Sequence, residues 1–448
     1  MRFLFVYPNH LLYKVTILSL SSLNKFSVTI ITTLGWVLWI TCIALISWLV
    51  YVNDVRGTIP YGQYVFFVFT ILAGIALFPS IRRVASVDLL KPFLLILTML
   101  FVYVFLSGMF GLSEIQGPRL ASILLLTVLP FVMLGVIVGG VKLYYLVIPL
   151  FFLALISAIG AAVLQWSGPL DLGGVRISNY LHGGKRWSFL FEEANGLAGV
   201  IAVGVTTLLY LAWVVERKVY GFLLVSLVMP FMLFVFWMTN SRASLGWLFW
   251  TFLVFGSIAM VMLYSEHQNR KTKYLWWGAG ISSIVAILIA LPVITDAMSE
   301  YLRLDQKDIS SGRLKIWGIY WQQFLENPLL GIGFGATSTF LAVESVRSPL
   351  NVYVGMLGET GLAGVLPLLI LWAGGVFYSA RAVVRAWNVD TDSMAVGLWC
   401  LAMLGGMAIQ QNGEWEIMRV SFINYVFFFT LTVAWVHCSR VSKPVEAA

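Results

Sequence analysis

Three arginines from separate regions of the chain, Arg186, Arg242 and Arg313, are the residues whose type best suits a chemical role. The guanidinium group is planar and always charged, and it holds phosphate oxygens through two parallel N–H groups. An arginine that faces the outer surface of a membrane is costly unless it pairs with an anion. We therefore expect the three side chains to form one pocket for a lipid-linked diphosphate. Separate pairing of each arginine with a glutamate or a lipid headgroup is the alternative.

These arginines are conspicuous because the chain carries little charge. Its 448 residues are 60% hydrophobic and only 11% charged, with a formal net charge of +8. A soluble domain is about 45–50% apolar and about 25% charged. The composition therefore argues against a cytosolic enzyme, a disordered chain, a disulfide scaffold and a nucleic-acid-binding protein. It favours a polytopic helical membrane protein whose surroundings are the lipid bilayer.

Apolar runs of about 20 residues, the length that crosses a bilayer, occur about twelve times along the chain. They lie at roughly 30–52, 62–80, 92–111, 120–139, 143–166, 193–215, 219–238, 243–263, 274–294, 351–378, 393–411 and 418–437. The sequence thus predicts an all-α integral membrane protein with about 12 transmembrane helices.

The segments between the runs divide the chain. We expect a cytoplasmic N-terminal segment at 1–29, helices 1–9 at 30–294 with a periplasmic loop at about 167–192, a long periplasmic loop at 295–350, helices 10–12 at 351–437, and a cytoplasmic tail at 438–448.

The long loop contains an amphipathic segment, RLKIWGIYWQQFLEN, which follows Ser311 and Gly312 and stops at Asn327-Pro328. We expect a helix that lies on the bilayer surface. Its apolar positions are Leu314, Trp317, Ile319, Tyr320 and Phe324.

Basic residues set the orientation of the spans, because cytoplasmic loops carry an excess of Lys and Arg. The short connections VERKV, EHQNRKTK and ARAVVRA are basic, whereas NDVRG, SEIQGPR and NGEWE are not. Both termini are therefore expected in the cytoplasm. A smaller basic group lies on the opposite side, in the loops 167–192 and 295–350 and at Arg242. The topology rule does not require those residues, so we assign them to function.

The cysteines and histidines show no metal-binding pattern. Cys42, Cys400 and Cys438 lie in or beside apolar runs without CxxC spacing, and the four histidines form no cluster along the chain. We expect no metal and no other cofactor.

Four segments, in this order, resemble the O-antigen ligase and polymerase superfamily. RWSFLFEEANGLAG (186–199) is similar to the family's Arg, aromatic and Asn segment, and TNSRASLG (239–246) to its Thr-x-Ser-Arg segment. SGRLKIWGIYWQQFLENPLLGIGFG (311–335) resembles its Arg-x-x-x-Trp helix and the glycine-rich turn that follows. LNVYVGMLGETGLAG (350–364) resembles its His-Asn-x-Tyr-Leu segment with Glu-x-Gly downstream. The likeness extends over roughly residues 190–440.

The resemblance implies a metal-free glycosyltransferase at the periplasmic face of the bacterial inner membrane, with a glycan on undecaprenyl diphosphate as donor. Arg186, Arg242 and Arg313 would hold the diphosphate and stabilise its negative charge as it leaves. The resemblance also gives Glu359 a catalytic place. The substrate-binding positions are Lys185, Asn195, Trp317 and Asn351.

One position departs from the ligase pattern. Leu350 stands where ligases of this family have a histidine directly before the asparagine. A leucine cannot accept a proton or hold an acceptor hydroxyl, so the departure favours the polymerase branch. The base that it leaves unassigned could be Glu192, Glu193 or Glu359. His182 is a weaker candidate for the pocket, because it lies in a polar loop segment.

We therefore predict a polymerase that joins undecaprenyl-diphosphate-linked repeat units into O-antigen, capsule or exopolysaccharide. An O-antigen ligase, which transfers lipid-linked glycan to lipid A core, is the alternative within the superfamily. A transporter or flippase of lipid-linked sugars is the alternative outside it, since an arginine-lined cavity also binds diphosphate. A chain-length regulator and a flippase are expected as partners through the resemblance alone.

Overall fold

A computed structural model describes a large part of the chain. The described residues are 33, 90–111, 124, 128–136, 142–168, 170–172, 175–177, 186–189, 194–215, 218–264, 313–336, 350–387, 389–414, 417–418 and 421–441. The spans expected at 30–52, 62–80 and 274–294 lie outside these residues, and the span expected at 120–139 lies only partly within them.

Eight helices among the described residues are long and apolar enough to cross a membrane. They are α3 (Leu90–Phe110), α5 (Leu143–Ser167), α6 (Ala194–Val214), α7 (Lys218–Thr239), α8 (Arg242–Tyr264), α12 (Val352–Ala386), α13 (Thr391–Gln410) and α14 (Phe422–Val433), the last continued by the π-helical turn η3 (Ala434–Cys438) and by α15 (Ser439–Val441). These helices occupy eight of the expected spans and confirm a helical, polytopic membrane protein. They do not test the total of about 12.

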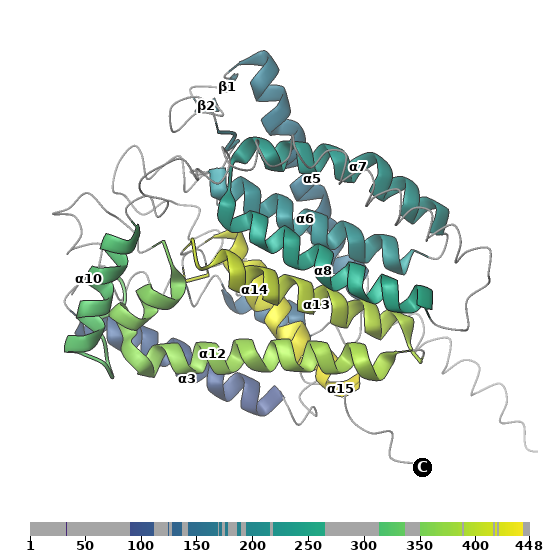
Figure 1. Ribbon diagram of the computed structural model, residues 1–448. Helices are drawn as coiled ribbons and strands as arrows, with labels where there is room; N and C mark the ends of the chain where they lie inside the picture. The colour runs from purple at the N-terminus through teal and green to yellow at the C-terminus, as the bar shows by residue number, and fades with distance from the viewer. Residues whose placement is uncertain are drawn as a thin grey trace, which may run out of the picture.

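The helices differ in burial far more than in apolarity. The span of α6 has a mean hydropathy of 2.1 and is 78% buried, whereas that of α7 has a mean hydropathy of 2.4 and is 22% buried. Lipid is as apolar as a protein core, so hydropathy alone does not reveal which helix is central. α13 and α14 form the centre, with α6 and α8 on one side and α12 on the other (Figure 1).

Close packing inside this bundle depends on small residues and on hydrogen bonds between helices. A Cβ on Gly204 of α6 would lie 2.2 Å from the Cβ of Ala154 on α5, so the two helices are nearly in backbone contact. The indole of Trp372 on α12 donates to the carbonyl of Leu404 on α13 at 3.0 Å. These contacts fix the relative height of helices whose surfaces are otherwise uniformly apolar.

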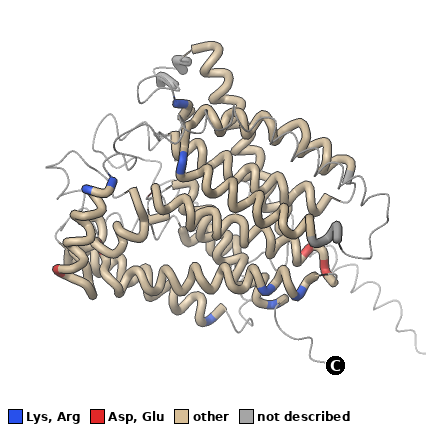
Figure 2. Tube along the Cα trace, viewed as in Figure 1, with Lys and Arg blue, Asp and Glu red and all other residues tan. Residues whose placement is uncertain are grey.

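Helices that directly follow one another in the chain run in opposite directions, as expected for successive spans. Near the end of α3, the hydroxyl of Tyr103 donates to the carbonyl of Thr360 near the start of α12, at 3.0 Å. Lysine and arginine gather at the two ends of the bundle, and the lengths between are almost free of charge (Figure 2). We call the end at which α6, α8 and α12 begin the outer end.

Two small elements lie at the outer end. β1 (Leu170–Leu172) and β2 (Val175–Ile177) form an antiparallel hairpin with Asp171 opposite Arg176, so the described residues include a short strand pair beside the helices. The helix expected after Gly312 is α10 (Arg313–Glu326). It packs beside the start of α12 (Figure 1).

The expected placement of α10 needs one correction. Tyr320 was expected on the bilayer-facing side, but it is 1% exposed and its ring lies against Gly358 of α12. The apolar side chains that α10 leaves exposed are Leu314, Trp321 and Leu325. The apolar residues of this helix therefore form two faces, one of them packed on the protein. Counting apolar positions along the sequence could not separate the two.

The turn after α10 is held against a break in α12. Gly361 has a φ of +58°, outside the helical range, and this interrupts α12 near its start. The amide of Gly333 donates to the carbonyl of Glu359 at 2.8 Å, and the amide of Leu362 donates to the carbonyl of Pro328 at 2.9 Å. Irregular backbone within a membrane protein must satisfy its polar groups internally, and the two segments do this for each other.

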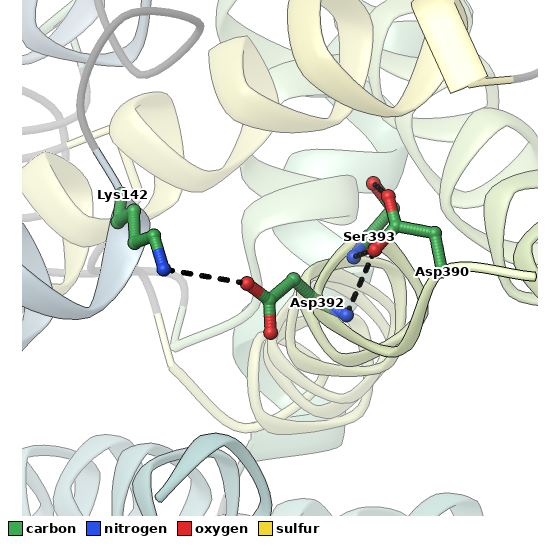
Figure 3. Close-up of polar contacts among 4 residues, drawn as sticks. All are labelled: Lys142, Asp390, Asp392 and Ser393. Atoms are coloured by element: carbon green, nitrogen blue, oxygen red, sulfur yellow. Dashed lines mark hydrogen bonds and ion pairs between the residues drawn. The ribbon is translucent and has the colours of Figure 1, made fainter. Parts of the chain in front are cut away.

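At the opposite end of the bundle, α13 begins with a well-formed cap (Figure 3). The carboxylate of Asp390 accepts the amides of Asp392 at 3.1 Å and Ser393 at 3.2 Å, and the hydroxyl of Ser393 at 2.5 Å. Asp392 forms an exposed ion pair with Lys142 at 3.8 Å. The cap satisfies amides that a helix start leaves without intrahelical partners.

Candidate anion site at the outer end

The turn at residues 411–414, between α13 and α14, lies where three other helices begin. The carbonyl of Gln411 accepts the amide of Val352, the first residue of α12, at 3.0 Å. A Cβ built on Gly413 would lie 2.9 Å from the Cβ of Ala243, in the first turn of α8. Asn195, in the first turn of α6, donates to the carboxylate of Glu414 at 2.6 Å. The starts of α6, α8 and α12 thus converge on four residues.

Arg186 reaches this turn through a chain of side-chain hydrogen bonds. Its Nε donates to the carbonyl of Thr239 at 2.8 Å, and its Nη2 donates to Oδ1 of Asn195 at 2.7 Å. The Nδ2 of Asn195 then donates to Oε1 of Glu414 at 2.6 Å. Glu414 is only 3% exposed. Residues from four parts of the chain are therefore joined in one polar network.

Arg313 reaches the same turn from α10. A Cβ on Gly413 would lie 2.8 Å from Nη1 of Arg313, so the guanidinium rests against the backbone of this glycine. Arg242 is the first residue of α8 and directly precedes Ala243, whose Cβ would lie 2.9 Å from the same Cβ built on Gly413. The three arginines expected to act together thus come from three elements that meet at the 411–414 turn.

Charge at this location favours an anion. The start of a helix carries a partial positive charge, and the starts of α6, α8 and α12 lie here beside the arginines. Within the turn at 411–414, Glu414 is the carboxylate, and it is linked to Arg186 through Asn195. The arginines and the helix starts gathered here suit an anionic group such as a diphosphate.

Backbone strain gathers at the same place. Among the described residues, the non-glycine positions with positive φ are Phe189 at 53°, Asn240 at 50° and Leu350 at 50°. Asn240 and Leu350 each stand two residues before a helix that begins at the site, and Phe189 follows Arg186 closely. Such residues cost of order 1–3 kcal/mol each and concentrate at functional sites. We read them as the means by which each chain segment turns sharply into its helix.

Asn351 lies at the site, but its side chain is engaged in hydrogen bonds to backbone groups. Its Oδ1 accepts the amides of Tyr353 at 2.9 Å and Val354 at 3.0 Å, which caps the start of α12. Its Nδ2 donates to the carbonyl of Asn412 at 3.2 Å. Asn351 therefore fastens α12 to the 411–414 turn, and it holds Leu350 next to that turn.

Glu359 lies in the broken part of α12 and away from the turn along the helix. It is 3% exposed, and its Oε2 accepts the amide of Gly335 at 3.0 Å. The contact joins Glu359 to the glycine-rich turn that follows α10. This hydrogen bond helps to hold the glycine-rich turn against α12.

The remaining expected site residues divide in two. Trp317 is half-buried and stands four residues after Arg313, on the same face of α10. Lys185, together with His182, Glu192 and Glu193, lies outside the described residues.

Glu414 is the site residue that the sequence analysis missed. It belongs to the NGEWE segment, which served there only as a short connection poor in basic residues. A carboxylate between two apolar spans was the available signal, since such a group needs a partner. Its partner, Asn195, is 219 residues away in sequence, and nothing in the local pattern connects the two.

No metal centre is evident in the part of the chain that the structure describes. There, no group of three or more His, Cys, Asp or Glu side chains is arranged to hold a metal ion.

The fold and the site together define a polytopic helical membrane protein with a cationic site at one end of its bundle. Residues 228–369 match the family model described as O-antigen ligase. This match covers less than half of the chain and supports a relation to the O-antigen ligase and polymerase superfamily, without separating the two branches. The family implies a membrane glycosyltransferase that acts on a lipid-linked glycan. No match was found among curated proteins.

The matched range contains Arg242, Arg313 and Glu359, but not Arg186, Asn195 and Glu414. The link between the two groups is made by the tertiary structure, at the 411–414 turn.

Proposed function

We propose that the chain is a polymerase that joins lipid-linked repeat units into a longer glycan, with the site at the 411–414 turn as its diphosphate-binding centre. The observation that supports this most strongly is the convergence of Arg186 and Arg313, from distant segments, on Gly413 and Glu414. The undecaprenyl carrier, the periplasmic orientation of this end, the inner membrane and the cytoplasmic termini belong to the same proposal.

In the reaction, the hydroxyl of an acceptor sugar attacks the anomeric carbon of the donor. The new C–O bond forms as the bond between that carbon and the diphosphate oxygen breaks, and the electron pair stays on the diphosphate. Guanidinium groups that are held at the site before the reaction would stabilise this charge without reorganising at the moment of reaction. Arg186, Arg242 and Arg313 take this role.

The proton of the acceptor hydroxyl must pass to a base. Of the three glutamates named from the sequence as possible bases, Glu359 is the one that lies among the described residues. Its carboxylate accepts a hydrogen bond from the amide of Gly335. Glu192 and Glu193, which immediately precede α6 in the sequence, are the other glutamates proposed as the base.

Leu350 supports the polymerase branch. Its backbone is held beside the 411–414 turn by Asn351, at the position where the resembling ligases carry histidine. The side chain placed there can exclude water but cannot accept a proton. The description of the matching family favours the ligase as the second candidate.

Deleting the gene from its host and measuring the length of the glycan product tests the proposal. We expect long chains to disappear while product bearing a single repeat unit remains. Accumulation of unligated, lipid-linked polymer would instead identify a ligase. Repeat units trapped on the cytoplasmic leaflet would identify a flippase and overturn both enzyme functions.

A further inference from the structure

We infer that Glu414 is a positioning residue for this site, which acts through Asn195 to set the orientation of Arg186. The inference rests on the proposed function, because it assigns Arg186 to the donor diphosphate. Glu414 lies outside both the matched family range and the residues named from the sequence.

The three side chains form a relay whose direction is determined by their chemistry. A guanidinium only donates hydrogen bonds, and an ionised carboxylate only accepts them. Asn195 must therefore turn its oxygen to Arg186 and its nitrogen to Glu414, as the bonds of 2.7 Å and 2.6 Å show. Reversing the amide would put like groups together at both ends. Glu414 thus selects the amide orientation that Arg186 needs.

A second atom of the Arg186 guanidinium is also held by the protein. Its Nε donates to the carbonyl of Thr239 at 2.8 Å, at the end of α7. With Nε and Nη2 both directed by protein acceptors, the plane of the guanidinium is set before any ligand arrives. A fork that is oriented in advance loses less conformational entropy when it binds a phosphate. Loss of Glu414 frees the amide of Asn195 to rotate and weakens the constraint that Asn195 places on Nη2 of Arg186.

The position of Glu414 also permits a sharp test, because two effects of its charge have opposite signs. A carboxylate that is only a neighbour of an anion site repels the anion, so its neutralisation would tighten binding. A carboxylate that orients a binding arginine strengthens binding, so its removal weakens it. The sign of the change separates the two.

The experiment measures the binding of undecaprenyl diphosphate to the full-length chain in lipid nanodiscs. For Glu414→Ala we expect affinity about tenfold weaker, the loss typical of removing a hydrogen-bond partner from a charged network. Glu414→Gln keeps an acceptor oxygen, so we expect a smaller loss in the same direction. Thermal unfolding of each variant shows whether it is folded, and the Gln variant provides the measurement if the Ala variant is not.

A double-mutant cycle with Arg186→Ala tests whether Glu414 acts through Arg186. We expect Glu414→Gln to change the affinity by less than about twofold in the Arg186→Ala background. An equal loss in both backgrounds, or tighter binding by Glu414→Gln in the otherwise unchanged chain, would overturn the inference. The matched control is Glu326→Gln, which removes one exposed carboxylate at the end of α10. This variant should bind undecaprenyl diphosphate as tightly as the unchanged chain. If the unchanged chain does not bind undecaprenyl diphosphate, the proposed function fails as well.

Discussion

The side-chain nitrogen of Asn195 donates a hydrogen bond to the carboxylate of Glu414 at 2.6 Å, and the two residues are 219 positions apart in the sequence. The bond fastens the start of α6 to the turn between α13 and α14. The same Asn195 side chain accepts a hydrogen bond from Arg186 at 2.7 Å, so the bond to Glu414 belongs to a polar network. The arginine site is therefore assembled around a buried polar contact, and the following predictions test its parts.

Arg186→Lys should lower the rate of glycan transfer by about a hundredfold, the loss typical of removing one preorganised donor to a developing negative charge. Lysine carries a single ammonium group, which cannot bond the Thr239 carbonyl and the Asn195 oxygen in the geometry of the guanidinium fork. The measurement is the rate of chain extension by the purified protein in proteoliposomes. Arg385→Lys, near the far end of α12, should leave that rate unchanged.

Unchanged transfer by Arg186→Lys, with the variant folded, would show that Arg186 does not hold the diphosphate as a fork. The same test applies to Arg242→Lys and Arg313→Lys, and activity that survives all three changes would contradict the site.

Gly413→Ala should reduce transfer while the bundle remains folded. The added methyl group would lie 2.8 Å from Nη1 of Arg313 and 2.9 Å from the Cβ of Ala243, closer than carbon normally approaches either atom. The long Arg313 side chain gives way more easily than the first turn of α8. We therefore expect the guanidinium to be displaced. The measurement is the affinity for undecaprenyl diphosphate, with thermal unfolding measured in parallel.

Gly256→Ala is the matched control for this change, because a Cβ there meets nothing within 4 Å. Wild-type affinity in Gly413→Ala would mean that Arg313 rests at the turn without binding the ligand.

Leu350→Gly should stabilise the chain by about 1 kcal/mol, because glycine adopts a φ of +50° without the strain that leucine bears there. Leu350→His should fold as well as the unchanged chain, since histidine tolerates positive φ better than leucine does. We expect Leu350→His to keep its polymerising activity and to show no transfer to lipid A core. Thermal unfolding and product analysis check the two statements.

A Leu350→His variant that gains transfer to lipid A core would show that this single residue separates the two branches. Destabilisation by Leu350→Gly would show that the leucine side chain stabilises the site by more than its backbone strain costs.

Asp390→Ala should destabilise the folded chain by about 0.5–2 kcal/mol, the range for the loss of a helix cap. The hydrogen bond from the Ser393 hydroxyl, aided by backbone amides, lowers the pKa of Asp390 from its ordinary 3.8. The stabilisation by the ionised cap is therefore complete well above pH 3.8 and is lost as the pH falls through the lowered pKa. Thermal unfolding at neutral and acid pH measures the difference between Asp390→Ala and the unchanged chain.

Asp392→Asn is the control, since it removes an exposed ion pair worth about 0–1 kcal/mol and leaves the cap in place. A difference between Asp390→Ala and the unchanged chain that does not shrink toward acid pH would contradict a charged cap.

Much of the fold could be predicted because crossing a bilayer requires a specific length and composition. The run expected at 143–166 is α5, which ends one residue later, and the run expected at 219–238 is α7, which is one residue longer at each end. The helix after Gly312 could be predicted for a related reason, since Asn327-Pro328 cannot continue it. Backbone hydrogen bonds within a helix are local, so local sequence specifies them.

The site could be predicted only in part. Arg186, Arg242 and Arg313 were identified because charge is rare in this chain and these arginines were not needed to set its orientation. Glu414 was overlooked, because a lone carboxylate in a short turn has no local feature that reveals its partner. The separation of Tyr320 from Leu314 and Trp321 on α10 was also missed, because apolar positions on one helix can face either protein or lipid.

The sequence by itself determined that the chain crosses a membrane many times and that a few arginines lie away from its main basic loops. Only the tertiary structure decided that Arg186 and Arg313 converge on Gly413 and Glu414. The physical reason is that apolar spans are interchangeable in lipid, so hydropathy does not set which spans are neighbours. Small residues in close contact and hydrogen bonds across the bundle make that choice, and they depend on residues far apart in the chain.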